Sequence, residues 1–331
     1  MRTQTVFSAD VLKLDAALAV DRITAAIREQ VLRDLRRKGV VLGLSGGIDS
    51  SVVAALSVRA LGQDRVLALL MPERESSGES LILGRLCAGH LGINTLVEDI
   101  TPLLEGAGCY RRRDEMIRTV IPDYGLDYKC KIVLPGLLEG ESYRIFSVVA
   151  QAPDGRQIKA RLTPEAYHGV VAATNFKQRV RKMMEYYHAD RMNYAVLGTP
   201  NRLEYDQGFF VKNGDGSADL KPIAHLYKTQ VYQLAEYLGV PEDIRSRPPT
   251  TDTYSMSQSQ EEFYFSLPYD KMDLCLYGKN HGVPAVDVAR AARLTPEQVE
   301  LVYRDITSKR KATRYQHLKP LLVEPVHEVA Y

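Results

Sequence analysis

Hydrophobic positions along the chain follow two spacings, and stretches of one kind alternate with stretches of the other. Short runs rich in branched apolar residues predict strands buried on both faces of a sheet: residues 40–44, 66–71, 95–99 and 194–197. Apolar residues three or four positions apart predict amphipathic helices: residues 21–38, 51–61, 79–91, 164–189 and 227–238. Strands that alternate with helices favour a parallel sheet with helices on both faces.

The segment from about residue 106 to residue 162 interrupts this alternation. It contains two runs of alternating polar and apolar residues, 143–150 and 157–162, on either side of a Pro-Asp-Gly turn at 153–155. Such a pattern predicts a β-hairpin. We interpret the segment as an insertion, or lid, on the sheet domain.

From about residue 266 to residue 320 the pattern is helical again. Thr295 is followed by proline at the first helical position and by Gln298 three residues later, which is a typical helix start. The predicted fold class is therefore α/β. We expect a doubly wound parallel sheet in one domain over residues 1–331, with an inserted β-hairpin segment and a helical C-terminal part.

Composition and charge exclude several classes of protein. The formal net charge of the 331 residues is +2, which gives no argument for a nucleic-acid or membrane partner. The 4 cysteines are scattered without a C-x-x-C pair, so neither a zinc site nor a disulfide framework is indicated. The chain has no apolar run near the roughly 20 residues that span a bilayer, and no signal peptide opens it. We expect a cytoplasmic protein.

The main chemical signal lies between the predicted strand 40–44 and the helix that follows it. The sequence Ser45-Gly46-Gly47-Ile48-Asp49-Ser50-Ser51 combines glycines, which let the backbone approach phosphate oxygens, with hydroxyl donors and a helix N-terminus. Phosphate would repel Asp49 unless a cation lay between them, so Asp49 is a natural Mg²⁺ ligand. The loop is not a Walker A motif, because no Gly-Lys-Ser/Thr closes it. A plain connecting turn is the alternative interpretation.

A second polar cluster follows the predicted strand 194–197, where open α/β sheets bind ligands. Its motifs resemble those of the ammonia-dependent NAD⁺ synthetases, a family within the ATP pyrophosphatases. The resemblance covers about residues 18–100 and 165–310. Besides the phosphate loop, it rests on these segments: Gly198-Thr199, Glu204, Gly208-Phe209-Phe210, Lys212, Gly214-Asp215-Gly216, Asp219-Leu220, Tyr227-Lys228-Thr229-Gln230-Val231, Leu238-Gly239-Val240-Pro241-Glu242 and Pro248-Pro249-Thr250.

The resemblance implies an adenine nucleotide α-hydrolase-like fold and a role for each matching residue. ATP would be bound by the phosphate loop and its neighbours: Ser45, Gly46, Gly47, Asp49, Ser50, Ser51, Thr199, Lys228 and Thr250. Asp49 and Glu204 would hold Mg²⁺. The dinucleotide substrate would be contacted by Arg179, Lys212, Asp219 and Lys309. Asp49 and Lys228 would act in catalysis. By spacing alone, a surface position is an equally good interpretation of Arg179.

The implied reaction is the amidation of deamido-NAD⁺ to NAD⁺ through an acyl-adenylate, with release of AMP and pyrophosphate. Ammonia must attack unprotonated, and we hypothesise that Asp219 accepts its proton. No glutaminase domain fits in this length, so ammonia is expected free or from a separate glutaminase. The family also implies a homodimer around its N-terminal helices, to which the apolar stripe at residues 23–35 could contribute. That stripe could equally pack on the chain's own sheet.

The chain departs from the family pattern in three places. Family members carry a His-Lys pair near the C-terminus, whereas here Ser308 precedes Lys309. The segment 106–162 is longer than the usual connection, and residues 258–265 are more aromatic than the usual acidic loop. All three departures fall where the family forms its substrate site. Two alternatives therefore remain: an amide ligase for a different carboxylate, and a nucleotide-binding module without turnover.

Overall fold

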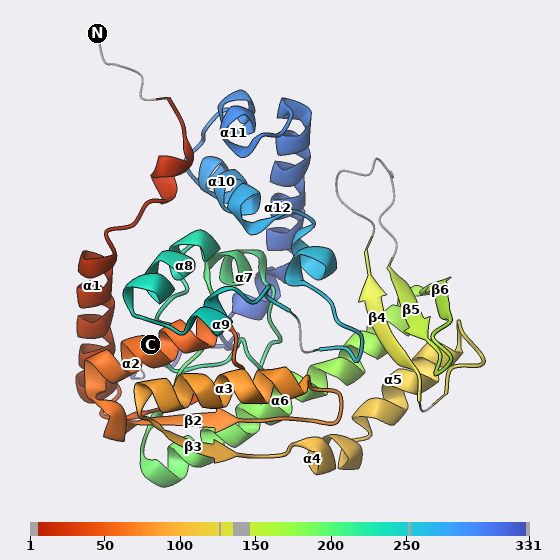
Figure 1. Ribbon diagram of the computed structural model, residues 1–331, viewed down its shortest axis with the longest axis horizontal. Helices are drawn as coiled ribbons and strands as arrows, with labels where there is room; N and C mark the ends of the chain where they lie inside the picture. Colours follow the sequence, from red (N-terminus) through yellow and green to blue (C-terminus); the bar gives the residue numbers. More distant parts are fainter. Residues whose placement is uncertain (1–5, 126, 135–145, 251–252, 329–331) are drawn as a thin grey trace.

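The computed structural model describes residues 6–125, 127–134, 146–250 and 253–328. At its centre is a 4-stranded parallel sheet in the order β3-β2-β1-β7 (Figure 1). The strands are β1 (Val40–Gly43), β2 (Val66–Leu70), β3 (Asn94–Val97) and β7 (Ala195–Val196). Each strand falls within or beside a run that the apolar pattern predicted, and the predicted parallel sheet is confirmed.

Helices cover both faces of this sheet, as predicted. Val40 and Leu42 of β1 point to one face, where they pack in a core built by α1 (Ala16–Glu29), α2 (Ile48–Leu61), α3 (Gly78–Leu91) and α8 (Lys228–Tyr237). Val41 points to the other face, which is covered by α6 (Pro164–Met192). The sheet is therefore doubly wound.

Local capping chemistry sets the limits of the helices around the cavity described below. Thr163 accepts a hydrogen bond from the Ala166 N–H at the start of α6, and Asn193 ends that helix in a left-handed conformation. The prediction that α2 starts at Ser51 was wrong, because the helix already begins at Ile48. The first turn of α2, Ile48-Asp49-Ser50-Ser51, has a single apolar residue, so an apolar periodicity could not reveal it.

The segment at residues 106–162 contains more structure than a hairpin. It includes α5 (Cys109–Arg118), which packs along α6, and a 3-stranded antiparallel sheet of β4 (Lys129–Val133), β5 (Ser147–Gln151) and β6 (Gln157–Arg161). The β5–β6 hairpin confirms the prediction, although residues 143–145 of the predicted first run lie outside the described residues. Strand β4 was not predicted. The boundary at residue 106 coincides with the end of the short helix α4 (Thr101–Gly106).

The C-terminal part is helical, as expected, and has a core of its own. Helices α10 (Tyr269–Asn280), α11 (Ala285–Ala292) and α12 (Pro296–His317) pack around Met272, Val288 and Val302, and form a separate group in Figure 1. The short helices α7 (Arg202–Gln207) and α9 (Glu242–Arg245) lie between this group and the sheet. Within the described residues, no helix has both the length and the apolar content needed to cross a bilayer.

Candidate nucleotide-binding site

A cavity of about 470 Å³ lies beyond the carboxyl ends of β1, β2 and β7. The residues that immediately follow these strands line it: Leu44 after β1, Met71 after β2, and Leu197 with Gly198 after β7. This is the edge at which open parallel sheets bind ligands. The fold therefore places the cavity where the sequence predicted a site.

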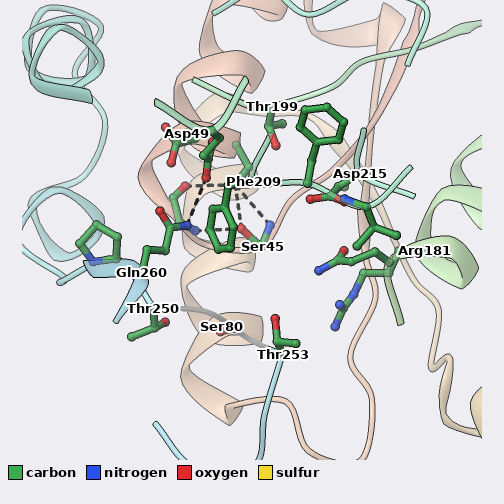
Figure 2. Close-up of a pocket in the computed structure, with 18 of the residues that line it drawn as sticks. Ser45, Asp49, Ser80, Arg181, Thr199, Phe209, Asp215, Thr250, Thr253 and Gln260 are labelled. Carbon is green, nitrogen blue, oxygen red and sulfur yellow. Dashed lines mark hydrogen bonds between the residues drawn. The ribbon is translucent and has the colours of Figure 1, made fainter. Parts of the chain in front are cut away.

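The phosphate loop forms one end of the cavity. Ser45, Gly47, Asp49 and Ser50 line it (Figure 2). Gly47 is the N-cap of α2 and supplies no side-chain cap, so the first N–H groups of this helix remain available to an anion. The hydroxyl groups of Ser45 and Ser50 lie 3.1 Å apart, and Ser50 also donates to the Gly47 carbonyl at 3.0 Å.

Gly46 and Ser51, two further residues predicted to bind ATP, lie behind the cavity surface. Gly46 has φ 75°, and a Cβ at this position would come within 2.7 Å of the Ser80 carbonyl on α3. Glycine is therefore required for close packing as well as for the turn. Ser51 is fully buried and donates to the Gly47 carbonyl at 2.9 Å. Both residues thus lie where they shape the loop.

Asp49 meets the second polar cluster at the start of α7. The Asn201 amide donates to Asp49 Oδ1 at 3.1 Å, and the Asn201 backbone N–H donates to Glu204 Oε2 at 2.9 Å. Asn201 therefore holds the two carboxylates predicted to bind Mg²⁺ next to each other. Lys228, at the first position of α8, forms an ion pair with Asp49. Lys228 is fully buried behind Asp49 and is not among the residues that line the cavity.

The electrostatics of this cluster suit a cation. Burial, together with the negative charge of Asp49, raises the pKa of Glu204 to about 8. Burial alone would lower the pKa of Lys228, but Asp49 and Glu204 outweigh it and raise that pKa. The described residues contain no group of three or more His, Cys, Asp and Glu side chains that could hold a metal. Two oxygen donors beside a phosphate loop fit Mg²⁺, which usually keeps water and substrate phosphate among its ligands.

The substrate-contact residues predicted by resemblance lie outside the cavity lining. Arg179 is exposed and donates to the Lys212 carbonyl at 3.3 Å, and Lys212 donates to the Tyr315 carbonyl at 2.9 Å. Asp219 is also exposed, and its Oδ2 accepts from the Val196 N–H at 2.8 Å. Lys309 donates to the Tyr264 carbonyl at 2.7 Å. The structure brings Arg179 and Lys212 together on the surface, and their contact with substrate stays a prediction.

A stripe of α6 residues lines the cavity, and the sequence analysis missed it. Its members recur at each turn of the helix, singly or as adjacent pairs: Tyr167, Val171, Thr174, Asn175, Gln178, Arg181, Lys182 and Glu185. Helical periodicity counted from Thr174, at i, i+4 and i+7, would have selected Gln178 and Arg181 instead of Arg179. Among the described residues, Arg181 has no hydrogen-bond or ion-pair partner, and Figure 2 shows it with Asp215 on the side opposite Gln260.

Other cavity residues come from the loop after β7 and from the part of the chain that begins at Thr250. Thr199 and Thr250, both predicted to contact ATP, line the cavity. Gln260, which was not predicted, also lines it and donates to Glu204 Oε1 at 3.2 Å. The aromatic departure from the family pattern forms a wall, in which Phe209 stacks on Tyr264 with ring centroids 4.5 Å apart. Ser308 is exposed on α12.

Comparisons with known proteins identify the family of this chain. A family described as NAD synthase has a model that matches residues 19–116 and 147–317. An NH₃-dependent NAD⁺ synthetase of Rhizobium meliloti (strain 1021) is 63% identical over 328 residues, which cover 99% of this chain and 98% of that protein. One from Thermotoga maritima is 33% identical over 86% of this chain and 97% of that protein.

Solved structures share the fold. An NMN synthetase of Francisella tularensis aligns over 95% of this chain and 100% of its own, with a TM-score of 0.65 and 21% identity. An NH₃-dependent NAD synthetase of Campylobacter jejuni aligns over 94% of this chain and 100% of its own, with a TM-score of 0.62 and 22% identity. With the fold, the phosphate loop and full-length relatives in agreement, this chain belongs to the NAD synthase family.

Proposed function

We propose that the protein is an ammonia-dependent NAD⁺ synthetase, which uses ATP to amidate deamido-NAD⁺. The observation that carries the proposal is the meeting of the phosphate loop, Asp49 and Glu204 at one end of a cavity in a chain of this family. A relative named as an NH₃-dependent NAD⁺ synthetase is 63% identical over 99% of this chain, which supports the same substrate and the same nitrogen donor.

A carboxylate resists amidation because its oxygen is a poor leaving group. In the first step its oxygen attacks the α-phosphorus of ATP, which gives an acyl-adenylate and releases pyrophosphate. Ammonia then attacks the carbonyl carbon, loses a proton and displaces AMP, leaving the carboxamide. Nucleotidyl transfer of this kind needs positioning and charge neutralisation, and no nucleophilic side chain.

The residues of the cavity are suited to these requirements. The free N–H groups at the start of α2 and the hydroxyls of Ser45 and Ser50 would bind ATP phosphate oxygens. Mg²⁺, held by Asp49 and Glu204, would neutralise part of the phosphate charge. With its raised pKa, Lys228 stays protonated and keeps a positive charge next to Asp49.

Two acids are candidates for the proton released by ammonia. Asp219 remains a hypothesis from the sequence, but it is not among the cavity residues. Asp215 lines the cavity, and burial raises its pKa above its usual value, which makes its carboxylate a better proton acceptor. Replacement of the acceptor by asparagine should slow amide formation and spare pyrophosphate exchange. Equal loss of both steps in Asp215→Asn would exclude it.

The experiment that tests the function is ATP/pyrophosphate exchange with a panel of carboxylates, followed by product analysis with ammonium. Exchange with deamido-NAD⁺, and NAD⁺ as the product, is the expected result. Exchange with a different acid alone would support an amide ligase of other specificity. No exchange with any acid, together with nucleotide binding, would support a module without turnover. Homodimerisation, also proposed from the family, is measured in the same preparation by light scattering.

A further inference from the structure

Strand β4 is an edge strand, and its outer edge is covered. In the order β4-β5-β6 it pairs with β5 on one side only. On the other side lies the segment at residues 253–265, which we call the capping segment. The Met256 N–H donates to the Cys130 carbonyl at 3.1 Å, and the Cys130 N–H donates to Ser255 Oγ at 2.9 Å. These bonds satisfy backbone groups that an uncovered edge would expose.

Side chains strengthen the same contact. The Gln258 amide donates to the Ile132 carbonyl at 2.7 Å, and Gln258 is 1% exposed. Lys131 forms an ion pair with Glu262 at 2.6 Å. In addition, Tyr254 and Phe263 pack in the apolar core of the three-stranded sheet. The capping segment is therefore attached to β4 by backbone, polar and apolar contacts.

The capping segment is also a wall of the nucleotide cavity. Its residues in the lining are Thr253, Tyr254, Gln260, Phe263 and Tyr264. Gln260 contacts Glu204, a proposed Mg²⁺ ligand. A second restraint acts from the opposite side, where the buried Lys177 donates to the Thr253 carbonyl at 3.0 Å. The position of this wall thus depends on β4 and on α6.

The restraint from β4 comes from a stretch outside the family model, although the Rhizobium meliloti relative aligns over 99% of this chain. The family model matches residues up to 116 and resumes at 147, so β4 lies in the part that it does not match. The capping segment, in contrast, lies within the matched range. Strand β4 therefore adds contacts to a segment that lies within the matched range.

We propose that the β4–β5–β6 sheet is a positioning element, which holds the capping segment over the cavity before substrates bind. Lys131 and Gln258 act as positioning residues through Gln260, Tyr254 and Phe263. A preformed wall spares the ordering free energy that binding would otherwise have to supply, so it lowers KM while kcat stays the same. The kinetic part of this proposal rests on the proposed function; the structural part does not.

The kinetic test uses Lys131→Met, with Lys159→Met as the matched control. Lys159 is an exposed lysine on β6 of the same sheet, and among the described residues it forms no hydrogen bond or ion pair with the capping segment. We expect Lys131→Met to raise the KM for ATP or the dinucleotide about threefold, as the loss of one partly exposed ion pair allows, at unchanged kcat. The charge-swapped pair Lys131→Glu with Glu262→Lys should restore KM. A fall in kcat without a change in KM would indicate mere destabilisation and overturn the proposal.

Hydrogen exchange in the substrate-free protein tests the structural part without any activity. Amides of residues 253–265 should exchange faster in Lys131→Met and in Gln258→Leu than in the parent protein, while those of β1 and β2 should be unchanged. Unaltered exchange and unaltered KM in both variants would overturn the proposal. If the parent protein makes no NAD⁺, the proposed function fails, whereas faster exchange in the variants would still support the positioning role.

Discussion

Arg179 and Arg181 lie two positions apart on α6, which places them about 200° apart around the helix axis. Arg181 lines the cavity without a partner among the described residues, whereas Arg179 is exposed and bound to the Lys212 carbonyl. We expect Arg181→Gln to raise the KM for ATP or for the dinucleotide about tenfold, the size of a lost charge-assisted hydrogen bond.

Arg179→Gln is the matched comparison for this prediction, because it removes the same charge from the same helix. Steady-state kinetics with each substrate varied in turn measures both variants. A larger effect from Arg179 than from Arg181 would show that the surface cluster with Lys212, and not this side of the cavity, binds the anionic part of the substrate.

Asp273 is a buried acid whose charge affects stability. It accepts hydrogen bonds from the N–H groups of Thr229, at 2.7 Å, and Lys228, at 3.3 Å, at the start of α8. Burial outweighs these bonds and raises its pKa to about 6. Because the folded protein holds this proton more tightly than the unfolded chain does, its contribution to stability is greatest below about pH 4 and falls as the pH rises to about 6.

The replacement Asp273→Asn keeps an acceptor for the helix and removes the titration. The difference in free energy of unfolding between parent and variant should therefore change by about 2 to 3 kcal/mol between pH 4 and pH 6.5, in favour of the variant at the higher pH. Urea unfolding at several pH values measures it. A difference that does not vary with pH would contradict this assignment.

At the scale of elements, one residue at the start of α7, Asn201, both caps the helix and contacts a proposed metal ligand. The Asn201 side chain accepts from the Leu203 N–H at 2.9 Å, and Glu204 closes the capping box by accepting from the Asn201 N–H. Asn201→Ala should therefore lower stability by about 1 to 2 kcal/mol and also release Asp49 from its side-chain partner, while Glu204 keeps the backbone N–H of residue 201.

If Asn201 acts only as a helix cap, its replacement should leave metal binding unchanged. A second measurement on the same variant, the Mg²⁺ dependence of pyrophosphate exchange, therefore separates the two roles. We expect the concentration of Mg²⁺ that gives half-maximal pyrophosphate exchange to rise in Asn201→Ala. Asn201→Asp is the informative control, since aspartate is an equally good cap but adds a third negative charge. If Asn201→Ala loses stability while its Mg²⁺ dependence is that of the parent, the Asn201 side chain does not position Asp49 for the metal.

How well sequence predicted structure also depends on scale. Regular elements such as β2 and α6 were predicted because burial leaves a local pattern, which is a continuous apolar run in β2 and a helical spacing of apolar residues in α6. The phosphate loop was predicted because its glycines and serines stand between a strand and a helix. Strand β4 and the capping segment were missed, since Cys130 and Ser255 lie 125 positions apart in the chain yet form one hydrogen bond. No local pattern records such a partner.

For the whole molecule, burial of the 4 cysteines offers a probe of unfolding. Burial raises the pKa of Cys109 to about 11 and of Cys275 to about 12, and also raises that of Cys87 and Cys130. In the folded state the four thiols are buried and stay protonated, so a disulfide reagent can neither reach them nor find the reactive thiolate. The reagent should therefore label these thiols only after unfolding. All of them should react at once in denaturant.

Ligand binding then provides the strongest form of this prediction. If every thiol reacts only through global unfolding, ATP with Mg²⁺ at a hundred times its dissociation constant should slow all of the labelling about 100-fold, because it stabilises the folded state alone. Mass spectrometry of partly labelled protein resolves the individual cysteines. A thiol that is labelled at the same rate with and without nucleotide would react through a local opening of the structure. For Cys130 on β4, such an opening would place the inserted sheet outside the cooperative unit that binds ATP.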